Sequence, residues 1–408
     1  MLTLQHQRRF VMEMLKEKIR AQAGSVYPEM TEIRRHLHQH PELSKHEFET
    51  AEFICRFLDK VGIAYTSGIG GNGIVALIEG KNPDKKVIGL RADMDALPIH
   101  EANDVDYKSV NQGVMHACGH DVHMTCLMGT AKLLYNLKDD FEGTIKLIFQ
   151  PSEEEYPGGA LMMIRDGVLE NPTPVMMFGQ HVLPGMAAGQ VGMKAGKYMA
   201  STDEIYFTVK GKGGHGATPE LNIDPIVIAA QIILALQQVV SRVAKPTMPT
   251  VFSIGRVIAD GRTNVIPNEV KMDGILRTFD EVWRKEAHEK ITHIAQTVAQ
   301  AFGGECDVFI DHGYPFLVND EAVTGLTRRL AEEYLGPENV IELGERMTAE
   351  DFAYFTQKVP SCFYRLGITD VEGKHVSNLH SSTFDVDEKS IETGIGLMTW
   401  LAVNALRD

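Results

Sequence analysis

The sequence predicts an α/β fold with a mixed sheet, interrupted by an inserted α+β domain. Helix and strand patterns alternate up to about residue 200 and again after residue 312, as is typical of α/β layers. Between these limits the order is β-α-β-β-α-β, the split βαβ (ferredoxin-like) arrangement with two helices on one face of an antiparallel sheet. A length of 408 residues suits two or three domains. We therefore expect the α/β domain at 1–199 and 313–408, and the inserted domain at 200–312.

The first α/β segment contains helical periodicity followed by apolar strand patterns. The helical pattern over 28–61 is cut by Pro41 and stops at Gly62, a residue type that commonly ends helices. The segment 86–95 opens with a mostly apolar run, as expected of a central strand covered on both faces. The other predicted elements are strands at 73–80 and 144–151 and a helix at 126–138.

The pattern of apolar and polar residues changes inside the inserted domain. Ile205, Phe207 and Val209 point to one side of the stretch DEIYFTVK, which indicates a strand with one solvated face. Pro225 suits the first turn of a helix expected at 224–243. Further elements are strands at 250–258, 269–279, 305–311 and 363–368 and helices at 281–303, at 320–335 and over the closing stretch KSIETGIGLMTWLAVNAL.

Charge and composition limit the partners of this chain. A net charge of −15 argues against general binding to nucleic acid or anionic lipid, because both require Lys and Arg to neutralise phosphate. Five cysteines, an odd number at wide spacing, fit free thiols in a reducing cytosol. The stretch MLTLQHQRRFVMEMLKEKIRAQAG lacks the apolar run of a signal peptide and is typical of an amphipathic surface helix. We expect no stretch that could cross a bilayer, and hence a cytoplasmic protein without membrane or nucleic-acid partners.

The stretch MHACGHDVH, residues 115–123, gathers lone-pair donors of the kind that hold borderline-soft metal ions. Cys118 and His120 can point to one side of an extended loop, and Gly119 between them permits unusual backbone dihedrals. One loop can supply two ligands, so a closed site needs further ligands from elsewhere in the chain.

Further donors follow predicted strand ends. Glu153, Glu154 and Glu155 come directly after the strand TIKLIFQP. His181 follows the apolar run PVMMFGQ, and His380 lies in NLHSS near the end of the chain. In open α/β sheets such positions converge at the carboxyl edge, where ligands bind. Each residue taken singly is most often structural or solvated, but together they predict a metal site.

Nine motifs resemble, in order, those of the M20 metallopeptidase family: RADMDALPI, MHACGHDVH, FQPSEEEYPGGA, GQHVLPG, GKGGHGATP, TNVIPNEV, LRTFD, EDFAYF and LHSSTFD. The resemblance is to the amidohydrolase branch, which contains aminoacylases, hippurate hydrolases and auxin-conjugate hydrolases. It runs from about residue 30 to the C-terminus. It implies a metallopeptidase catalytic domain with the inserted domain as a lid.

The resemblance also implies one or two divalent ions among manganese, zinc, nickel and cobalt. Their ligands would be Cys118, His120, Glu154, His181 and His380. Glu153 would be the general base, and Asp93 would orient a ligand beside the metal. Arg91 stands where other branches have a histidine, which shifts a ligand role onto Cys118 and His120. Glu155 remains an alternative ligand, because the register of the acid triplet is open.

For the inserted domain, the resemblance implies contacts to the substrate. His215 would stabilise the developing oxyanion, commonly across a dimer interface. Asn264 and Arg277 match positions that bind the substrate carboxylate, and a guanidinium fork suits a carboxylate. A surface salt bridge is the alternative for Arg277. A homodimer through this domain is implied by the resemblance alone.

Four motif residues remain without a chemical role. His116 and His123 flank the metal loop, and we expect them to be structural or to support the ligands. His38 and Glu42 match the family's N-terminal signature in HLHQHPEL, for which no role follows from the sequence.

The leading hypothesis is a metal-dependent hydrolase of the amide bond in N-acyl-L-amino acids. Dipeptides are alternative substrates, because they share the same amide and carboxylate. A second hypothesis is a thiol hydrolase with Cys118 as nucleophile, which leaves Glu154, His181 and His380 without purpose. A third is a binding protein without catalysis, against which the intact Glu153 argues.

Overall fold

The computed structural model describes residues 4–370, 372 and 377–407, and the chain divides into two units. The first unit comprises Met1–Gly196, Val318–Gly344 and Tyr354–Asp408, and the second comprises Lys197–Leu317 and Glu345–Ala353. The breaks after 196 and 317 lie near the limits expected for the inserted domain. The short segment Glu345–Ala353 belongs to the second unit, which the sequence patterns do not suggest.

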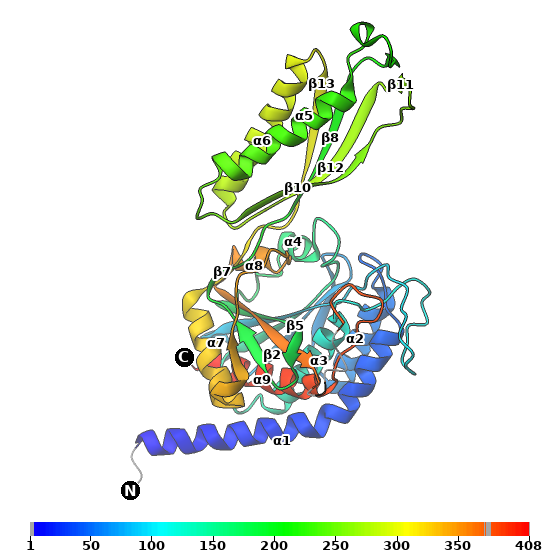
Figure 1. Ribbon diagram of the computed structural model, residues 1–408. Coiled ribbons are helices and arrows are strands. Elements are labelled where there is room, and N and C mark those ends of the chain that lie inside the picture. Colours follow the sequence, from blue (N-terminus) through cyan, green and yellow to red (C-terminus); the bar gives the residue numbers. More distant parts are fainter. Residues whose placement is uncertain (1–3, 371, 373–376, 408) are drawn as a thin grey trace. The chain divides into compact units, whose positions relative to one another are not determined.

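An eight-stranded mixed sheet forms the centre of the first unit, in the order β1-β2-β4-β3-β5-β16-β6-β15 (Figure 1). The strands are β1 (Tyr65–Ile69), β2 (Gly73–Glu79), β3 (Val87–Asp93), β4 (Thr144–Gln150), β5 (Met176–Ala187), β6 (Val191–Met193), β15 (Val340–Glu342) and β16 (Ser361–Thr369). The four neighbours β4, β3, β5 and β16 are parallel, and β2 and β6 flank them antiparallel. Every residue of β3 and β4 is buried, so the predicted α/β fold with a mixed sheet is confirmed.

Helices cover this sheet in two layers. They are α1 (Leu4–Gln39), α2 (Phe48–Val61), α3 (His120–Asn136), α4 (Gly159–Arg165), α7 (Glu321–Leu335), α8 (Ala353–Thr356) and α9 (Lys389–Ala405), with short 3-10 turns η1 (Pro83–Lys85) and η4 (Pro337–Asn339). Helices α3 and α9 pack against the sheet and against each other, and α1 packs across both of them. The N-terminus of α3 therefore begins in the interior of the unit.

The helix boundaries agree only in part with those predicted from the sequence. Helix α2 ends as predicted at Gly62, whose φ of 89° is left-handed. Helix α1 ends at Gln39, two residues before Pro41, and starts far earlier than residue 28. Helix α3 starts at His120 rather than 126, because all residues of its first turns are buried, polar ones included, and no amphipathic period is visible there.

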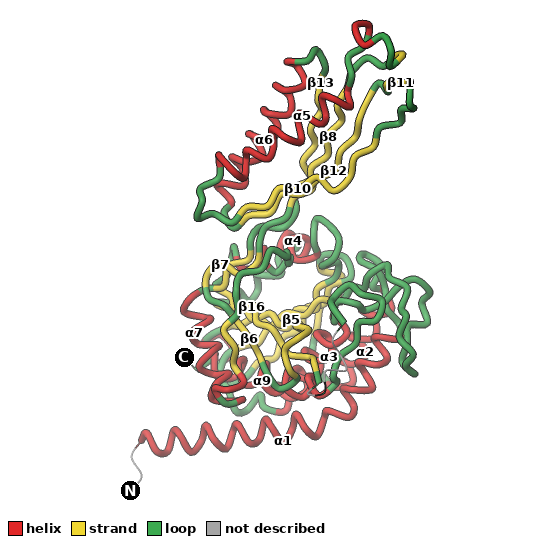
Figure 2. Tube along the Cα trace, viewed as in Figure 1, coloured by secondary structure: helices red, strands yellow, loops and turns green. Residues whose placement is uncertain are grey.

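The second unit is built from the predicted β-α-β-β-α-β order. Its sheet runs β10-β12-β8-β13 with all neighbours antiparallel, and α5 and α6 cover one face (Figure 2). The elements are β8 (Asp203–Lys210), α5 (Pro225–Gln238), a π-helical turn η3 (Val239–Val243), β10 (Thr250–Ile258), β12 (Glu269–Thr278), α6 (Glu281–Ala301) and β13 (Glu305–His312), with β9 (Gly214–His215), η2 (Pro219–Leu221) and β11 (Val265–Ile266) as short segments. The short strands β7 (Gly196–Met199) and β14 (Leu317–Asn319) span the two breaks between the units. Ile205, Phe207 and Val209 are buried beneath the helices, as their alternation predicted.

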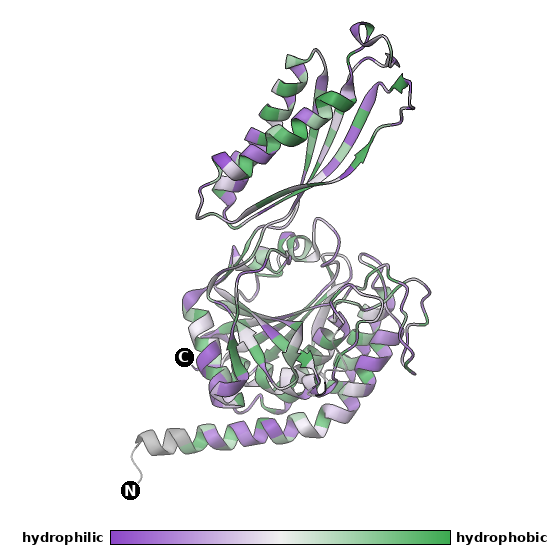
Figure 3. Cartoon of the chain, viewed as in Figure 1, coloured by the Kyte–Doolittle hydropathy of each residue, from purple (hydrophilic) through white to green (hydrophobic). Residues whose placement is uncertain are grey.

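The expectation that no stretch could cross a bilayer is wrong for this unit. The 19 residues Pro225–Val243 are long and apolar enough, by length and composition, to do so. The sequence pattern does not reveal this property, because the buried residues of α5 recur at the spacing of any helix that packs one face against a core. Only 28% of that stretch is buried, although Figure 3 colours much of α5 as hydrophobic.

We expect the substitution Gly159→Ala to destabilise the first unit. A Cβ at this position would lie 1.7 Å from the carbonyl oxygen of Pro151, which is backbone and cannot move aside alone. The expected loss is about 1–3 kcal/mol of unfolding free energy, measured by denaturant titration. Gly325→Ala is the matched control: nothing lies within 4 Å of its Cβ position in α7, so it should stabilise by about 0.5–1 kcal/mol. Equal stability of Gly159→Ala and wild type would contradict the packing described here.

Candidate metal centre

The parallel strands of the first unit align polar residues in one row across the sheet. Asp93 of β3 lies beside Gln150 of β4, and His181 of β5 lies beside Arg365 of β16. Because Arg91 pairs with Gly179, His181 falls level with Asp93. The loops that follow β3 and β4 leave the sheet at this row, which is where α/β sheets bind ligands.

The metal loop depends on one glycine. Gly119 has a φ of 85°, and a Cβ there would lie 2.5 Å from Cγ2 of Val182. Only glycine combines this left-handed conformation with this close approach. The turn at Gly119 ends the loop and begins α3, so that Cys118 and His120 reach the same place from either side of it.

The five predicted ligands converge. The sulfur of Cys118 lies 3.4 Å from Nε2 of His181, and His120 completes a group whose donor atoms all lie within 4.8 Å of one another. Cys118 also belongs to a second group of this size with Glu154 and His380. Nε2 of His380 lies 3.2 Å from Oε1 of Glu154. The Cys118 sulfur is thus common to both groups.

Hydrogen bonds fix which imidazole nitrogen faces the cluster. Nδ1 of His120 lies 2.8 Å from the carbonyl oxygen of Asp95, and Nδ1 of His181 lies 2.8 Å from that of Val182. Each Nδ1 therefore donates, and each Nε2 faces the cluster. Nε2 of His120 is buried with no hydrogen-bond partner among the described residues, a costly condition that a cation relieves. Thiolate, imidazole and carboxylate donors together fit a borderline-soft divalent ion.

Burial and charge shift the donors in different directions. Burial alone would lower the pKa of His120, but Asp93 and Asp95 outweigh it and raise this pKa to about 10. Burial raises the pKa of the Cys118 thiol well above its ordinary value. Burial also holds the pKa of His181 well below its ordinary value. Without a cation, Cys118 and His120 therefore keep their protons.

Asp95, which the sequence interpretation did not single out, contacts the predicted ligand His120, and the role expected of Asp93 stays a prediction. Oδ1 of Asp95 lies 3.2 Å from Nδ1 of His120, and its Oδ2 accepts hydrogen bonds from Ser44 and from the backbone N–H of Glu154. It thus ties two predicted ligands together. Its position two residues after Asp93 on an extended stretch was the signal that could have found it.

Asp93 instead belongs to a closed set of partners. One of its oxygens accepts from Arg91 at 2.6 Å, and the other accepts from Nδ1 of His123 at 2.6 Å. Nε2 of His123 accepts the backbone N–H of Val182, so both ring nitrogens are engaged. Asp93 comes no nearer to His120 Nε2 than 3.7 Å. His123 is thus a structural histidine, as expected.

The acid triplet divides between interior and surface. Glu153 is 5% exposed and forms, with His120 and Glu154, another group of donor atoms within 4.8 Å. Glu155 is exposed and pairs with Lys45, which takes it away from the cluster. Ser152, just before Glu153, has a φ of 54°, and His380 has a φ of 61°. Strained residues of this kind gather at functional sites.

The remaining predicted residues lie elsewhere. His116 is buried with neither ring nitrogen hydrogen-bonded among the described residues, and burial lowers its pKa to about 3. In the second unit, His215 and Asn264 are exposed neighbours, since the N–H of Gly216 donates to the carbonyl of Asn264. Arg277 lies at the opposite end of β12 from Glu269, about 27 Å away along the strand direction.

Known proteins resemble this chain over most of its length. A family model described as peptidase family M20/M25/M40 matches residues 89–404. The N-acetyl-L-cysteine deacetylase of Bacillus subtilis (strain 168) is 40% identical over 359 residues, covering 88% of this chain and 84% of that protein. Thermostable carboxypeptidase 2 of Saccharolobus solfataricus is 37% identical over 392 residues, covering 95% and 98%. A crystal structure of a dinuclear metal-binding peptidase of the M20 family from Bacillus subtilis is 33% identical with a TM-score of 0.81, covering 94% and 99% of the two chains.

We expect metal uptake to release protons. Below the raised pKa values of Cys118 and His120 both groups are protonated, so an ion that binds both must displace about two protons. Affinity should then rise with pH, by about tenfold per unit for each proton released. Calorimetric titration with zinc in buffers of different ionisation enthalpy measures the number.

The substitution Cys118→Ser serves as the control, because it should lower the number of released protons by about one. A zinc affinity that does not change between slightly acidic and slightly alkaline pH would contradict the assignment of these two donors.

Proposed function

This chain is a metal-dependent amidohydrolase of the peptidase family M20/M25/M40, and on that basis we propose that its substrates are N-acyl-L-amino acids. The reaction releases a carboxylic acid and a free amino acid. The N-acetyl-L-cysteine deacetylase at 40% identity supports this substrate class. A dipeptide is the second candidate, favoured by the carboxypeptidase at 37% identity, because it offers the same amide and carboxylate.

The position of Glu153 carries the proposal. Its carboxylate is buried, and its donor atom lies within 4.8 Å of those of His120 and Glu154. We propose that Glu153 takes the proton of the attacking water and returns it to the leaving amine. Glu154 serves a different purpose, since of two adjacent acids one can hold a cation while the other transfers a proton.

We propose one or two divalent ions, manganese, zinc, nickel or cobalt, held by Cys118, His120, Glu154, His181 and His380. When bound, such an ion polarises the amide carbonyl and lowers the pKa of a water molecule. The Cys118 sulfur shared by two donor groups supports two neighbouring positions. Asp95 holds the His120 ring so that Nε2 faces the donor cluster. Asp93 is proposed to act indirectly, by holding the neighbouring His123 ring.

Residues of the second unit are proposed to bind the substrate. Asn264 and Arg277 would hold its carboxylate, and His215 would hold the developing oxyanion. Because His215 and Asn264 lie at one end of the unit and Arg277 at the other, one copy would serve two sites with them. This supports a homodimer in which each copy lends His215 and Asn264 to the other.

The outer surface of α5 supports the same homodimer. Leu234 is 65% exposed and Val227 is 54% exposed, and both lie on this mostly apolar helix. Strand β10 is an edge of the sheet and exposes Val257. A second copy of the unit would cover this surface, which we favour over a membrane because α5 packs against α6 and the sheet. We also propose a cytoplasmic location, since all five cysteines are free thiols.

The thiol-hydrolase alternative is disfavoured by the same burial that suits a metal. A thiolate nucleophile needs a low pKa for Cys118, and its partner His181 would have to accept a proton. Burial shifts both pKa values the opposite way, raising that of Cys118 and lowering that of His181.

A screen of N-acyl amino acids tests the proposed substrates. Acetyl, benzoyl, indolyl and longer acyl groups, and dipeptides as the second class, would each be assayed with manganese, zinc, nickel and cobalt. We expect hydrolysis of N-acyl amino acids and its loss with a chelator, which would spare a thiol hydrolase. Hydrolysis of dipeptides alone would replace the first substrate class by the second.

The substitution Glu153→Gln should lower kcat by about 10²–10⁴-fold while metal binding stays as in wild type. Glu155→Gln is the matched control: the neighbouring acid pairs with Lys45 on the surface, so its loss should leave kcat unchanged. A Glu153→Gln enzyme with near-normal kcat would remove Glu153 from the reaction.

The substitution Leu234→Asp should convert a dimer to a monomer, because it places a charge in the proposed apolar interface. Light scattering measures the mass. Val282→Asp changes an apolar side chain that is 81% exposed at the start of α6 and should leave the dimer intact.

Mixing subunits tests the lent histidine. Mixtures of Glu153→Gln and His215→Ala chains should regain roughly a quarter of wild-type activity, since one site of each mixed dimer is complete. Failure of the mixture to regain activity would place His215 in its own chain's reaction or outside it.

A further inference from the structure

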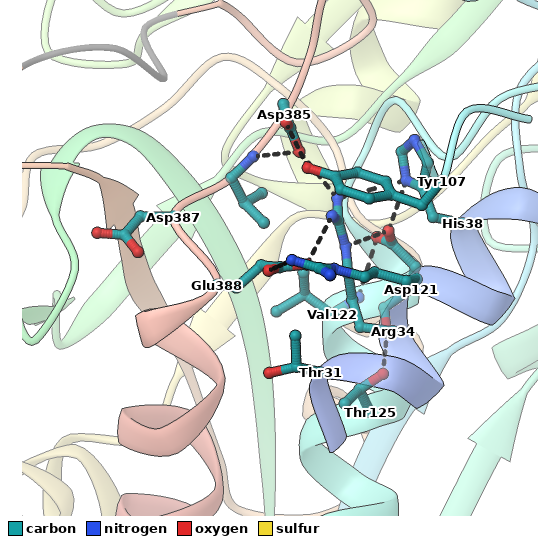
Figure 4. Close-up of polar contacts among 12 residues, drawn as sticks. Thr31, Arg34, His38, Tyr107, Asp121, Val122, Thr125, Asp385, Asp387 and Glu388 are labelled. Carbon is teal, nitrogen blue, oxygen red and sulfur yellow. Dashed lines mark hydrogen bonds and ion pairs between the residues drawn. The ribbon is translucent and has the colours of Figure 1, made fainter. Parts of the chain in front are cut away.

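Four buried ionisable groups close to the predicted ligands in the chain or in space take no part in the proposed reaction, and Figure 4 shows three of them, Arg34, His38 and Asp121. They are Arg34 and His38 of α1, Asp121 of α3 and Glu101 of the loop after β3, and none is more than 3% exposed. We call them the Arg34 cluster. His38 belongs to the motif HLHQHPEL, for which neither the sequence nor the proposed function supplies a role.

Asp121 is the member closest to a proposed ligand, because it follows His120 directly. Its Oδ2 accepts hydrogen bonds from Nε of Arg34 at 2.9 Å and from Nδ1 of His38 at 2.7 Å. Its Oδ1 accepts the backbone N–H of Val122 at 3.0 Å. Oδ2 thus binds α1 to Asp121, while Oδ1 fixes Asp121 within the first turn of α3.

Arg34 holds a second segment with its other nitrogens. Its Nη2 lies 3.2 Å from Oδ1 of Asp385, and its Nη1 lies 3.5 Å from Oε1 of Glu388. The hydroxyl of Tyr107 donates to the second oxygen of Asp385 at 2.9 Å, and the guanidinium lies over the Tyr107 ring (Figure 4). Asp385 belongs to the loop that follows His380.

Backbone hydrogen bonds join the same two loops. The N–H of His380 donates to the carbonyl of Ala117, next to Cys118, at 2.8 Å. The N–H of Ala102 donates to the carbonyl of Ser382 at 2.7 Å, and the neighbouring Glu101 lies 3.2 Å from Nε2 of His38. The loop before Cys118 and the loop after His380 are therefore held to one another and to the Arg34 cluster.

A buried ion pair of this kind contributes little net stability, so we look for its effect in the positions of the groups that it joins. Removing charges from water costs about as much as their attraction returns, so an apolar replacement is often as stable. A guanidinium, however, has donors in a fixed planar fork and can set the distance between two carboxylates. Here those carboxylates, Asp121 and Asp385, stand next to the two segments that carry His120 and His380.

We propose that Arg34, His38 and Asp121 are positioning residues that fix the separation of His120 and His380, and thereby tune the affinity of the metal centre. The inference rests on the proposed function, in which both histidines are ligands. It also gives the N-terminal motif a role, since α1 brings one cation to a point between two ligand-bearing segments that are far apart in the chain.

Cobalt binding tests the proposal. The variants are Arg34→Lys, which keeps the charge but loses the fork, and Asp385→Asn, which weakens the contact to the loop after His380. We expect each to lower cobalt affinity by about 10–100-fold, in competition with a chromophoric chelator, and to change the cobalt absorption spectrum. The double variant should lose less than the sum, because both changes act on one contact.

Glu29→Gln is the matched control. Glu29 also joins α1 to α3, through Lys132, but near the far end of α3 and with both side chains about one third exposed. Its loss should leave cobalt affinity within about twofold of wild type. Thermal unfolding of the metal-free proteins records any general loss of stability, and if Arg34→Lys does not fold, the more exposed Asp385→Asn decides alone.

Unchanged cobalt affinity and spectrum in both variants, with only the unfolding temperature lowered, would overturn the proposal and leave the cluster a purely structural role. Wild-type protein that binds no cobalt at all would overturn the proposed ligands themselves. The two failures are therefore distinguishable in the same titration.

Discussion

Lone pairs that are buried without hydrogen-bond donors define the first unit of this protein. Nε2 of His120 has no partner among the described residues, and the Cys118 sulfur stands between two groups of further donors. A buried polar atom without a partner costs about 1–3 kcal/mol, and a cation removes that cost. The left-handed turns at Gly119, Ser152 and His380 surround the same volume. The proposed metal centre would give these buried donor atoms a partner.

The residues that hydrogen-bond to the proposed ligands, or lie next to them, form pairs of opposite charge or of donor and acceptor. Asp95 accepts from His120 and from the backbone of Glu154, so one carboxylate orients two donors. Asp93 is neutralised by Arg91 and carries His123, whose second nitrogen accepts a strand N–H. A hydrogen bond to the second ring nitrogen fixes the tautomer and the orientation of a metal-binding imidazole. Glu153, the proposed general base, is then the acid left for proton transfer.

The second unit is organised around apolar surface rather than around polar donor atoms. Its core is closed by Ile205, Phe207 and Val209 under two helices, and this satisfies one face of its sheet. The outer side of α5 remains apolar, and β10 remains an unpaired edge among the described strands. Surfaces of this kind are rarely left to solvent, because they lower the free energy of association. The unit is therefore well suited to pairing with a second copy.

Local pattern determined most of the fold and the identity of the donors. Apolar runs predicted β3 and β4, alternation predicted β8, and Gly62 ended α2 where expected, because periodicity and backbone preference act within a few residues. Residue type also picked out candidate donors in the sequence, since few side chains bind such ions, and the family resemblance reduced them to the five proposed ligands. Tertiary structure alone decided that α3 begins at His120, that Asp95 holds this ring, and that Arg34 joins Asp121 to Asp385. These contacts join side chains from separate segments, and a periodic pattern records which face a residue takes but not which distant residue it meets.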